Sequence, residues 1–585
     1  MKNRKITALL LGMAVAVSSF STVQAAETGS TPATIAPADS LDLAGMFSEK
    51  DLDDSRSDAA VRITLEDTAA KAEDESVQID GKTVTITEAG TYVLSGTLTD
   101  GQIIVETEET EDVRLILDGV TITNDDSACI FVKSGDKVVL TLAEGSENVL
   151  SDTGAEYVQP DEGSTVDGVI FSREDLSVNG TGSLTVEAGY KHGIVCKDDL
   201  AVTGGTITVD AADKGIVGED SVRIKDGTIT VTSADDAVCS DTSDKEGKGF
   251  IYIEGGSLEL AAGDDGIHAE TSLLIAGGTI DVTESKEGLE GATVDITDGD
   301  IRIKAQDDGI NAAYKTSGAA GEASDSIRVE DGGMGMTPPE DMGGQRMPDG
   351  MPEMPEDMQE MRAGRHGSPG GWQEMPDGMP EMPDGMPEMP DDWQGMRGDM
   401  QGMPGGMQGM PGGGFGMMDA LADCYLRISG GTIFVDADGD GLDSNGYLYL
   451  DGGTVVVEGP TNDGNGALDY GIDAVVSGGT LIATGSAGMA QAFGSASTQS
   501  FLYYSFDQTI SAGTEVTITD EDGSEVYVFT PGKDFRNIIY TAPELEKGAV
   551  YEIAAGSGSG TAEAGTEQAG YAGMQGGGMM PGQPF

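Results

Sequence analysis

Short stretches in which apolar and polar residues alternate recur along the chain. Residues 204–209 (Gly-Gly-Thr-Ile-Thr-Val) return in similar form at 226–231 and 255–260. This period-two pattern predicts β-strands with one buried face. Equivalent apolar positions fall at 184, 207, 229, 258, 280 and 301, in steps of 23, 22, 29, 22 and 21 residues. A nearly constant period of this length is typical of a solenoid.

One strand-and-turn unit of about 22 residues cannot bury its apolar side alone, whereas stacked units share a continuous core. We therefore expect an all-β chain that forms a right-handed parallel β-helix. Between 84 and 150 the alternation continues with less regular spacing, which predicts irregular first coils. The aromatic-rich stretch at 500–553 predicts a small β cap that closes the far edge of the stack.

One segment interrupts the repeats. Residues 313–423 are built largely on Met-Pro-Asp-Gly and Met-Pro-Glu units, and this content of Pro, Gly and acid predicts a disordered insertion. Methionine sulfur can bind Cu(I), but an expanded low-complexity linker explains the composition more simply. The predicted plan is a signal peptide at 1–25, an N-terminal linker and cap region at 26–79, the first part of the β-helix at 80–312, the insertion at 313–423, the second part at 424–499, the C-terminal β cap at 500–553 and a disordered tail at 554–585.

The N-terminus has the form of a secretory signal peptide, because Lys2, Arg4 and Lys5 precede an apolar run and small residues follow near Ala25. The apolar run is too short to span a bilayer, so no membrane insertion is expected. We predict a secreted, monomeric protein that is released or held non-covalently at the cell surface. The four cysteines lack metal-ligand spacing, and buried thiols explain them better than disulfides.

Charge restricts the partners. The chain has 103 acidic and 32 basic residues, so it would repel nucleic acid and anionic membranes. It would also repel anionic polysaccharides unless a cation bridges them. High acidity can simply keep an extracellular protein soluble, but that does not explain where the acidic residues are placed.

Acidic residues and glycine gather just after the repeated strands, at 264–266, 286–288, 307–309 and 438–441. Glycine suits a turn that needs positive φ. Stacking brings like charges to about 5 Å, where two carboxylates repel by roughly 1 kcal/mol in water and more near a low-dielectric surface. Ca²⁺ would remove this repulsion, because it binds carboxylate, amide and carbonyl oxygens. A second polar ladder is expected two residues beyond the glycines, at His268, Glu290, Asn311, Asp443 and Asp473.

The predicted cofactor is therefore Ca²⁺. Its predicted ligands are Asp264, Asp265, Glu287, Glu290, Asp307, Asp308, Asn311, Asp438, Asp440 and Asp443. The alternative is that these residues cap turns by accepting hydrogen bonds from local amides. Residues 436–441 resemble the start of an EF-hand loop, but Tyr447 stands at position twelve and no helical pattern flanks them.

The ordered motifs at 264–269, 287–291, 307–312, 438–446 and 459–468 resemble those of a secreted clostridial carbohydrate-binding β-helix family. The resemblance covers roughly residues 80–553. It implies a calcium-binding parallel β-helix related in shape to pectate-lyase-type polysaccharide lyases. It also implies plant cell-wall polysaccharides, such as cellulose and polygalacturonate, as partners. Residues 235–238 depart from the glycine pattern, which puts calcium in doubt there.

Aromatic residues offer a sugar-binding surface. Aligned repeats place Phe250 and Tyr252 in the same outward rows as Tyr447 and Tyr449, and Tyr425 lies one repeat before Tyr447. A flat row of exposed rings can stack on pyranose rings, but it can also simply stabilise the strands beneath it.

An enzyme remains the alternative. A calcium-dependent polysaccharide (pectate) lyase needs Lys or Arg as a base beside the metal, and Lys214 and Lys286 are weak candidates. A lysine next to acidic residues more simply balances their charge. Paired carboxylates for glycoside hydrolysis also stay open, while three histidines make a serine triad improbable. We rank a carbohydrate-binding protein first, a lyase second and a structural cell-surface adhesin third.

Overall fold

Strands make up most of the described chain. The computed structural model describes residues 43–55, 59–108, 110, 112–160, 165–243, 245–313 and 423–565. Within them the helical elements are η2 (Leu43–Gly45) and α1 (Glu49–Leu52), and neither is long enough to cross a bilayer. The all-β prediction is confirmed. The predicted signal peptide and nearly all of the predicted insertion lie outside the described residues.

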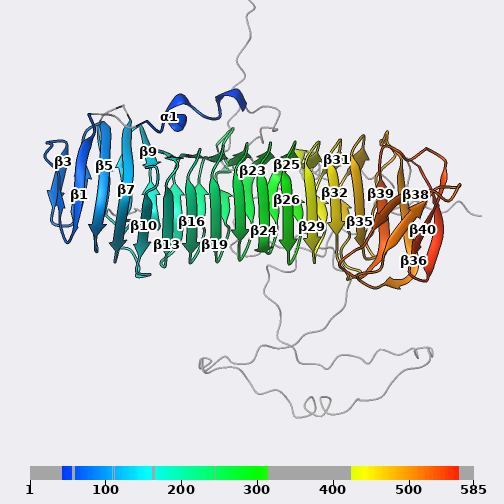
Figure 1. The fold of residues 1–585 in the computed structure, drawn as a ribbon. Helices are drawn as coiled ribbons and strands as arrows, with labels where there is room; N and C mark the ends of the chain where they lie inside the picture. Colours follow the sequence, from blue (N-terminus) through cyan, green and yellow to red (C-terminus); the bar gives the residue numbers. More distant parts are fainter. Residues whose placement is uncertain are drawn as a thin grey trace, which may run out of the picture. The chain divides into compact units, whose positions relative to one another are not determined.

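The strands run side by side in chain order and form three rows, A, B and C (Figure 1). Row A consists of β10 (Glu147–Asp152), β13 (Ser183–Ala188), β16 (Thr206–Ala211), β19 (Thr228–Ser233), β22 (Ser257–Ala261), β24 (Thr279–Ser285), β26 (Asp300–Ala305), β29 (Thr432–Ala437), β32 (Thr454–Glu458) and β35 (Thr480–Gly485). Each pairs in parallel with the next member of the row.

Row B follows row A after a short turn, which we call the A–B turn. Its members are β4 (Thr83–Ile86), β6 (Gln102–Glu106), β8 (Ile130–Ser134), β11 (Gly168–Ser172), β14 (His192–Cys196), β17 (Ile216–Gly218), β20 (Val238–Ser240), the first parts of β23 (Ile267–Ile275) and β25 (Leu289–Ile296), β27 (Ile310–Ala312), β30 (Leu442–Ser444) and β33 (Leu468–Tyr470). These pairings are parallel too.

Row C completes each round before the chain returns to row A. It contains β9 (Lys137–Leu142), β12 (Asp175–Gly180), β15 (Asp199–Val202), β18 (Ser221–Ile224), β21 (Phe250–Ile253), the second parts of β23 and β25, β28 (Tyr425–Ile428), β31 (Tyr447–Leu450) and β34 (Asp473–Val476). Its members also pair in parallel. We call one passage through the three rows a rung.

The apolar positions used for the spacing argument meet in the structure. Leu184, Ile207, Ile229, Leu258, Ile280 and Ile301 are successive Cα partners in row A. Their side chains are at most 1% exposed and belong to a hydrophobic core that continues from rung to rung. Burying one such side chain contributes about 1.5–3 kcal/mol, so each added rung extends the core that its neighbours need.

The glycines of the A–B turns are required for close packing and not for positive φ, which corrects the expectation from the sequence. A Cβ on Gly266 would lie 2.6 Å from the carbonyl oxygen of Gly288, and one on Gly309 would lie 2.6 Å from that of Gly441. Positive φ occurs instead where row C returns to row A, for example at Gly205 with φ of +94°. The A–B turns therefore stack backbone on backbone, which brings their side chains into one line.

Both ends of the stack extend beyond the predicted limits. At the start, β1 (Val61–Asp67), β5 (Gly90–Leu98) and β7 (Val113–Asn124) pair in parallel. β2 (Ala70–Lys71) pairs antiparallel with β1, and β3 (Val77–Asp80) pairs antiparallel with β4 of row B. The stack thus begins at Val61, inside the region predicted as linker and cap.

At the far end, β39 (Phe535–Thr541) pairs antiparallel with β35 and β36 (Phe501–Ile510), which covers the last edge of row A. A second sheet contains β37 (Val516–Thr519), β38 (Glu525–Phe529), β40 (Val550–Ala555) and β41 (Gly558–Glu563). The strands β40 and β41 show that ordered structure continues into residues predicted as a disordered tail.

Candidate functional site

Two polar ladders run beside each other along the A–B turns and the outer face of row B. In the turns, the amides of Gly266, Gly288 and Gly309 donate to the carbonyl oxygens of Glu287, Asp308 and Asp440 one rung on, at 2.8–3.0 Å. On row B, the polar residues follow one another as Cα partners in the order His268, Glu290, Asn311, Asp443 and Asp469.

The last member of the row B ladder differs from the prediction. Asp469 is the Cα partner of Asp443, whereas Asp473 pairs with Tyr447 in row C. Leu442 pairs with Leu468, 26 positions later. This rung is longer than the usual 22 residues, and its extra turn shifted the alignment made from the sequence.

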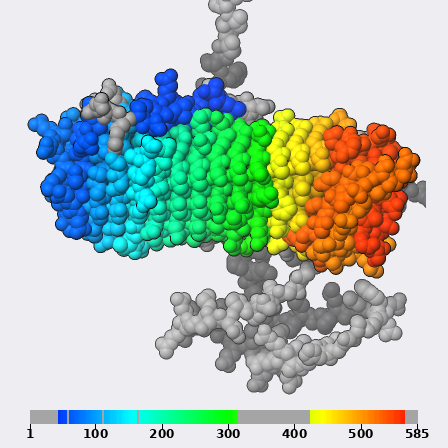
Figure 2. All heavy atoms as spheres, viewed as in Figure 1, coloured from blue at the N-terminus to red at the C-terminus, as the bar shows by residue number. Residues whose placement is uncertain are grey.

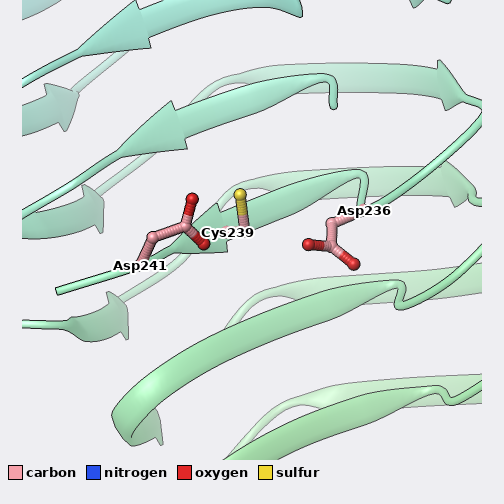
Figure 3. Close-up of side chains that lie close together, drawn as sticks. All are labelled: Asp236, Cys239 and Asp241. Atoms are coloured by element: carbon pink, nitrogen blue, oxygen red, sulfur yellow. The ribbon is translucent and has the colours of Figure 1, made fainter. Parts of the chain in front are cut away.

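At the upstream end of the ladders a lysine neutralises the acidic residues. Asp236 and Asp241 flank the buried thiol of Cys239 (Figure 3). The ammonium of Lys214 lies 3.0 Å from Asp236 and 3.1 Å from Asp241. Burial alone would lower the pKa of Lys214, but the two carboxylates raise it. Lys214 therefore occupies the position of a cation at this rung and carries its proton at neutral pH, which argues against it as a catalytic base.

A histidine has the same role two rungs further on. His268, Asp265 and Glu290 are each at most 5% exposed. The Nδ1 atom of His268 is 2.9 Å from Asp265 and also contacts Glu290. Burial opposes the charged imidazole, but hydrogen bonds with Asp265, Glu270 and Glu290 raise the pKa of His268 well above its usual value. Asp265 and Glu290, both predicted calcium ligands, thus already have a protein cation between them.

Other acidic residues near row B also contact lysines. Lys286 lies 3.5 Å from Asp264, another predicted ligand. Burial opposes the charge of Lys286, but Asp264 and Glu287 raise its pKa, so it too is protonated. At the other end of row B, where the chain turns into row C, Lys248 contacts Asp198 and Asp199. Asp438, predicted as a ligand, is instead largely exposed and pairs at 2.8 Å with Lys533 of the C-terminal cap.

Further along the ladders, Glu287 and Asp443 are neighbours of Asn311, and Asp308 and Asp440 interact electrostatically with Asp443. We call these five residues the acidic cluster. Asn311 donates to Glu287 at 2.9 Å, while its buried Oδ1 atom finds no hydrogen-bond partner within the described part of the chain. Asp308 accepts from the amide of Asp440 at 2.6 Å. Among the described residues, Asp308 and Asp443 have no basic partner within ion-pair distance.

The protein environment opposes negative charge in the acidic cluster. Burial, together with the charge of Asp440, raises the pKa of Asp308 to about 8. Burial and the charges of Asp308, Asp469 and Asp440 raise that of Asp443 well above its usual value. A cation among these oxygen atoms would reverse both effects. Asp307, the last predicted ligand, lies at the same turn and contributes to the raised pKa of Asp308.

The predicted aromatic residues divide into an exposed and a covered group. Tyr425 and Tyr447 are Cα partners, as expected, and the rings of Tyr447 and Tyr449 stack at 5.7 Å. All three are partly exposed on row C. Phe250 and Tyr252 do share these ladders, but they are only 9% and 4% exposed. The expectation that both are available to a sugar is therefore wrong for the chain as it is folded here.

The Phe250 and Tyr252 side chains are covered by the N-terminal segment. Met46 packs with both of them in one small apolar cluster, and Phe47 lies 6.1 Å from the Tyr252 ring. The sequence gives no periodic signal for this contact, because residues 43–53 lie outside the repeats. The four cysteines are all buried and free.

The described chain is thus an all-β stack. Acidic residues line the A–B turns and row B, and partly exposed tyrosines lie on row C. Residues 80–333 match the family model described as "Carbohydrate-binding domain-containing protein". A relative from Acetivibrio thermocellus with that same description is 38% identical over 158 residues, which is 27% of this chain and 55% of the relative. The chain therefore spans about half the length of the curated relative it matches.

A solved structure entitled "Structure of the polysaccharide lyase-like protein from C. thermocellum, Gadolinium derivative" is 32% identical. The match covers 42% of this chain and all of that one, with a TM-score of 0.38.

Proposed function

We propose that this chain is a secreted, calcium-dependent carbohydrate-binding protein that winds as a right-handed parallel β-helix. The parallel pairing within all three rows supports a helical winding of the chain. A right hand is proposed because crossovers between parallel strands are almost always right-handed. The family match over residues 80–333 supports a carbohydrate as the ligand. Plant cell-wall polysaccharides such as polygalacturonate and cellulose are the proposed partners.

The observation that carries the proposal is the acidic cluster. Its donors are all oxygen atoms, which suits Ca²⁺ with its six to eight oxygen ligands. Among the described residues, the buried Oδ1 atom of Asn311 has no hydrogen-bond partner, and Asp308 and Asp443 have no basic partner within ion-pair distance. Lys214 and His268 supply the positive charge upstream, so calcium is needed where that supply ends.

Calcium would serve both the fold and the ligand. It would offset the repulsion within the acidic cluster, and an ion bound only to the folded state stabilises that state by mass action. It would also let the uronate carboxylates of polygalacturonate approach a face that otherwise repels them. The rings of Tyr425, Tyr447 and Tyr449 would hold neutral sugar rings by stacking, because these tyrosines stand together and partly exposed on row C.

The test measures polysaccharide binding with and without calcium. Retention on polygalacturonate should be strong in millimolar CaCl₂ and lost in EGTA, and Asp443→Asn should weaken it. The matched control is Asp300→Asn, which removes an exposed carboxylate from β26 on another face and should leave retention unchanged. Equal retention with and without EGTA, or equal losses in the two variants, would contradict the proposed role of the acidic cluster.

A further inference from the structure

The N-terminal segment Leu43–Asp53 lies along the outer face of row C without joining its sheet. It contains η2 and α1, and its atoms cover the flank of the stack above the cyan and green rungs (Figure 2). Beneath it, Phe250, Tyr252 and Leu274 form an apolar patch, with Met46 as the residue of the segment that seals it. The apolar patch is therefore buried by a short segment and not by another strand.

The covered apolar patch lies on the same row C ladder as one of the exposed tyrosines. Tyr252 leads through Leu274, Asp295 and Arg427 to Tyr449 as successive Cα partners in row C. Four steps at about 4.8 Å place the two tyrosines about 19 Å apart along one line. An aromatic ring thus stands at each end of the line, with an acidic and a basic side chain between them. Such a line offers stacking at both ends, and the partly exposed Arg427 can donate between them, whereas Asp295 is buried.

Most polar contacts of the segment are made by residues 50–53, far from the apolar patch. The buried Asp51 carboxylate pairs with Lys137 at 2.5 Å and accepts from Ser177. Its carbonyl oxygen accepts from Asn179 and Thr203. Over the apolar patch itself, Arg223 donates to the Met46 carbonyl at 2.9 Å. Lys50 and Asp53 add ion pairs with Asp112 and Arg114 at 2.9 and 3.0 Å. The ion pairs thus anchor one end of a cover whose apolar end lies several rungs away.

We infer that Phe250, Tyr252 and Leu274 form a second sugar-binding subsite, and that Leu43–Asp53 is its detachable cover. The ligand class is a β-linked polysaccharide such as cellulose, because Phe250 and Tyr252 present rings for stacking. Arg223, the Cα partner of Tyr252, would donate to sugar hydroxyls once it no longer donates to the Met46 carbonyl. Met46 and Phe47 occupy the place that the apolar face of a sugar ring would take. Detachment joins this subsite to the Tyr425, Tyr447 and Tyr449 surface. The inference rests on the proposed carbohydrate-binding function.

Asp51 also defines how the cover can be released. Burial alone would raise its pKa, but hydrogen bonds from Lys137 and Ser177 lower that pKa to about 2. A carboxyl whose pKa is lowered in the folded state stabilises that state above its unfolded value near 4, and the contribution is lost as the pH falls toward 2. Mild acid therefore leaves the cover in place, and its anchor must be removed by substitution.

The test compares variants of the full chain for retention on insoluble cellulose. Asp51→Ala/Lys137→Ala removes both charges of the buried pair and leaves Asp175, the second partner of Lys137, in contact with water at 32% side-chain exposure. Met46→Ser/Phe47→Ser weakens the apolar end independently. Release is verified by faster hydrogen exchange of residues 43–53. Lys71→Ala is the matched control, since Lys71 is exposed and pairs with Glu66 of β1, outside the cover.

Both release variants should bind cellulose roughly 3- to 10-fold more tightly, the gain expected of an added aromatic platform. Adding Tyr252→Ala should abolish the gain, whereas Tyr252→Ala alone should not alter binding by the covered protein. Verified release without tighter binding, or a gain that survives Tyr252→Ala, would overturn the subsite. If exchange at residues 43–53 is already fast in the unsubstituted protein, the segment is not a cover and the inference fails. A protein that binds no polysaccharide in any form would overturn the proposed function as well. Release variants that bind cellulose only as tightly as the unsubstituted protein, through Tyr447 and Tyr449, would overturn the subsite alone.

Discussion

We expect Asp308→Asn, a substitution in the acidic cluster, to have opposite effects on stability with and without calcium. Asp308→Asn keeps the oxygen that accepts from the amide of Asp440 but removes a carboxyl whose pKa is raised to about 8 by burial and neighbouring charge. A carboxyl with a raised pKa binds its proton more tightly in the folded state, so metal-free stability should fall as the pH rises from 4 to 8. The slope is about 1.4 kcal/mol per pH unit for one group.

At pH 7 this slope amounts to about 4 kcal/mol as an upper limit. We expect Asp308→Asn to stabilise the metal-free protein by about 1–3 kcal/mol, because side chains can turn toward water and reduce the repulsion. In millimolar calcium the same variant should be less stable than the unsubstituted protein, since it has lost a ligand. Urea unfolding in EGTA and in CaCl₂, at pH 5 and pH 8, gives all four values. A variant that is less stable in EGTA at pH 8 would refute the argument.

Three further outcomes follow from the same contacts. Tyr447→Ala/Tyr449→Ala should reduce retention on cellulose with a melting temperature within a few degrees of the parent, and equal retention would refute a stacking role; Phe434→Ala, on another face, is the control. Gly309→Ala should lower the free energy of unfolding by about 1–3 kcal/mol, because its Cβ would meet the carbonyl oxygen of Gly441 on the next rung. Unchanged urea unfolding would contradict this packing. Lys214→Met should destabilise by about 3–5 kcal/mol in calorimetry, since Asp236 loses its cation, while a neutral effect would show that this ion pair is dispensable.

The periodic part of the chain could be predicted in detail. Alternation and spacing located the apolar positions of row A because each is a Cα partner of the next, and this regularity repeats in every rung. The same logic placed Asn311 beside Asp443 and Tyr425 beside Tyr447. It failed at Asp473, where one rung is longer than its neighbours.

What the repeat pattern could not reveal lies in contacts between distant segments. Met46 and Phe47 cover Tyr252 although they precede the stack in the sequence. Asp438 forms an ion pair with Lys533 of the C-terminal cap, about 95 residues later in the chain. In each case a spacing argument identified the residue but not the partner that determines its charge or exposure.

The central claim concerns an ion in the acidic cluster, and the most direct measurement is an anomalous-scattering map of crystals grown with calcium. We expect a peak bounded by Asp308, Asn311 and Asp443, with oxygen atoms about 2.3–2.6 Å from it. No peak is expected between Asp265 and Glu290, where His268 supplies the positive charge. A map without an ion at Asp308 and Asp443, with their carboxyl groups held by protein hydrogen bonds alone, would contradict the account.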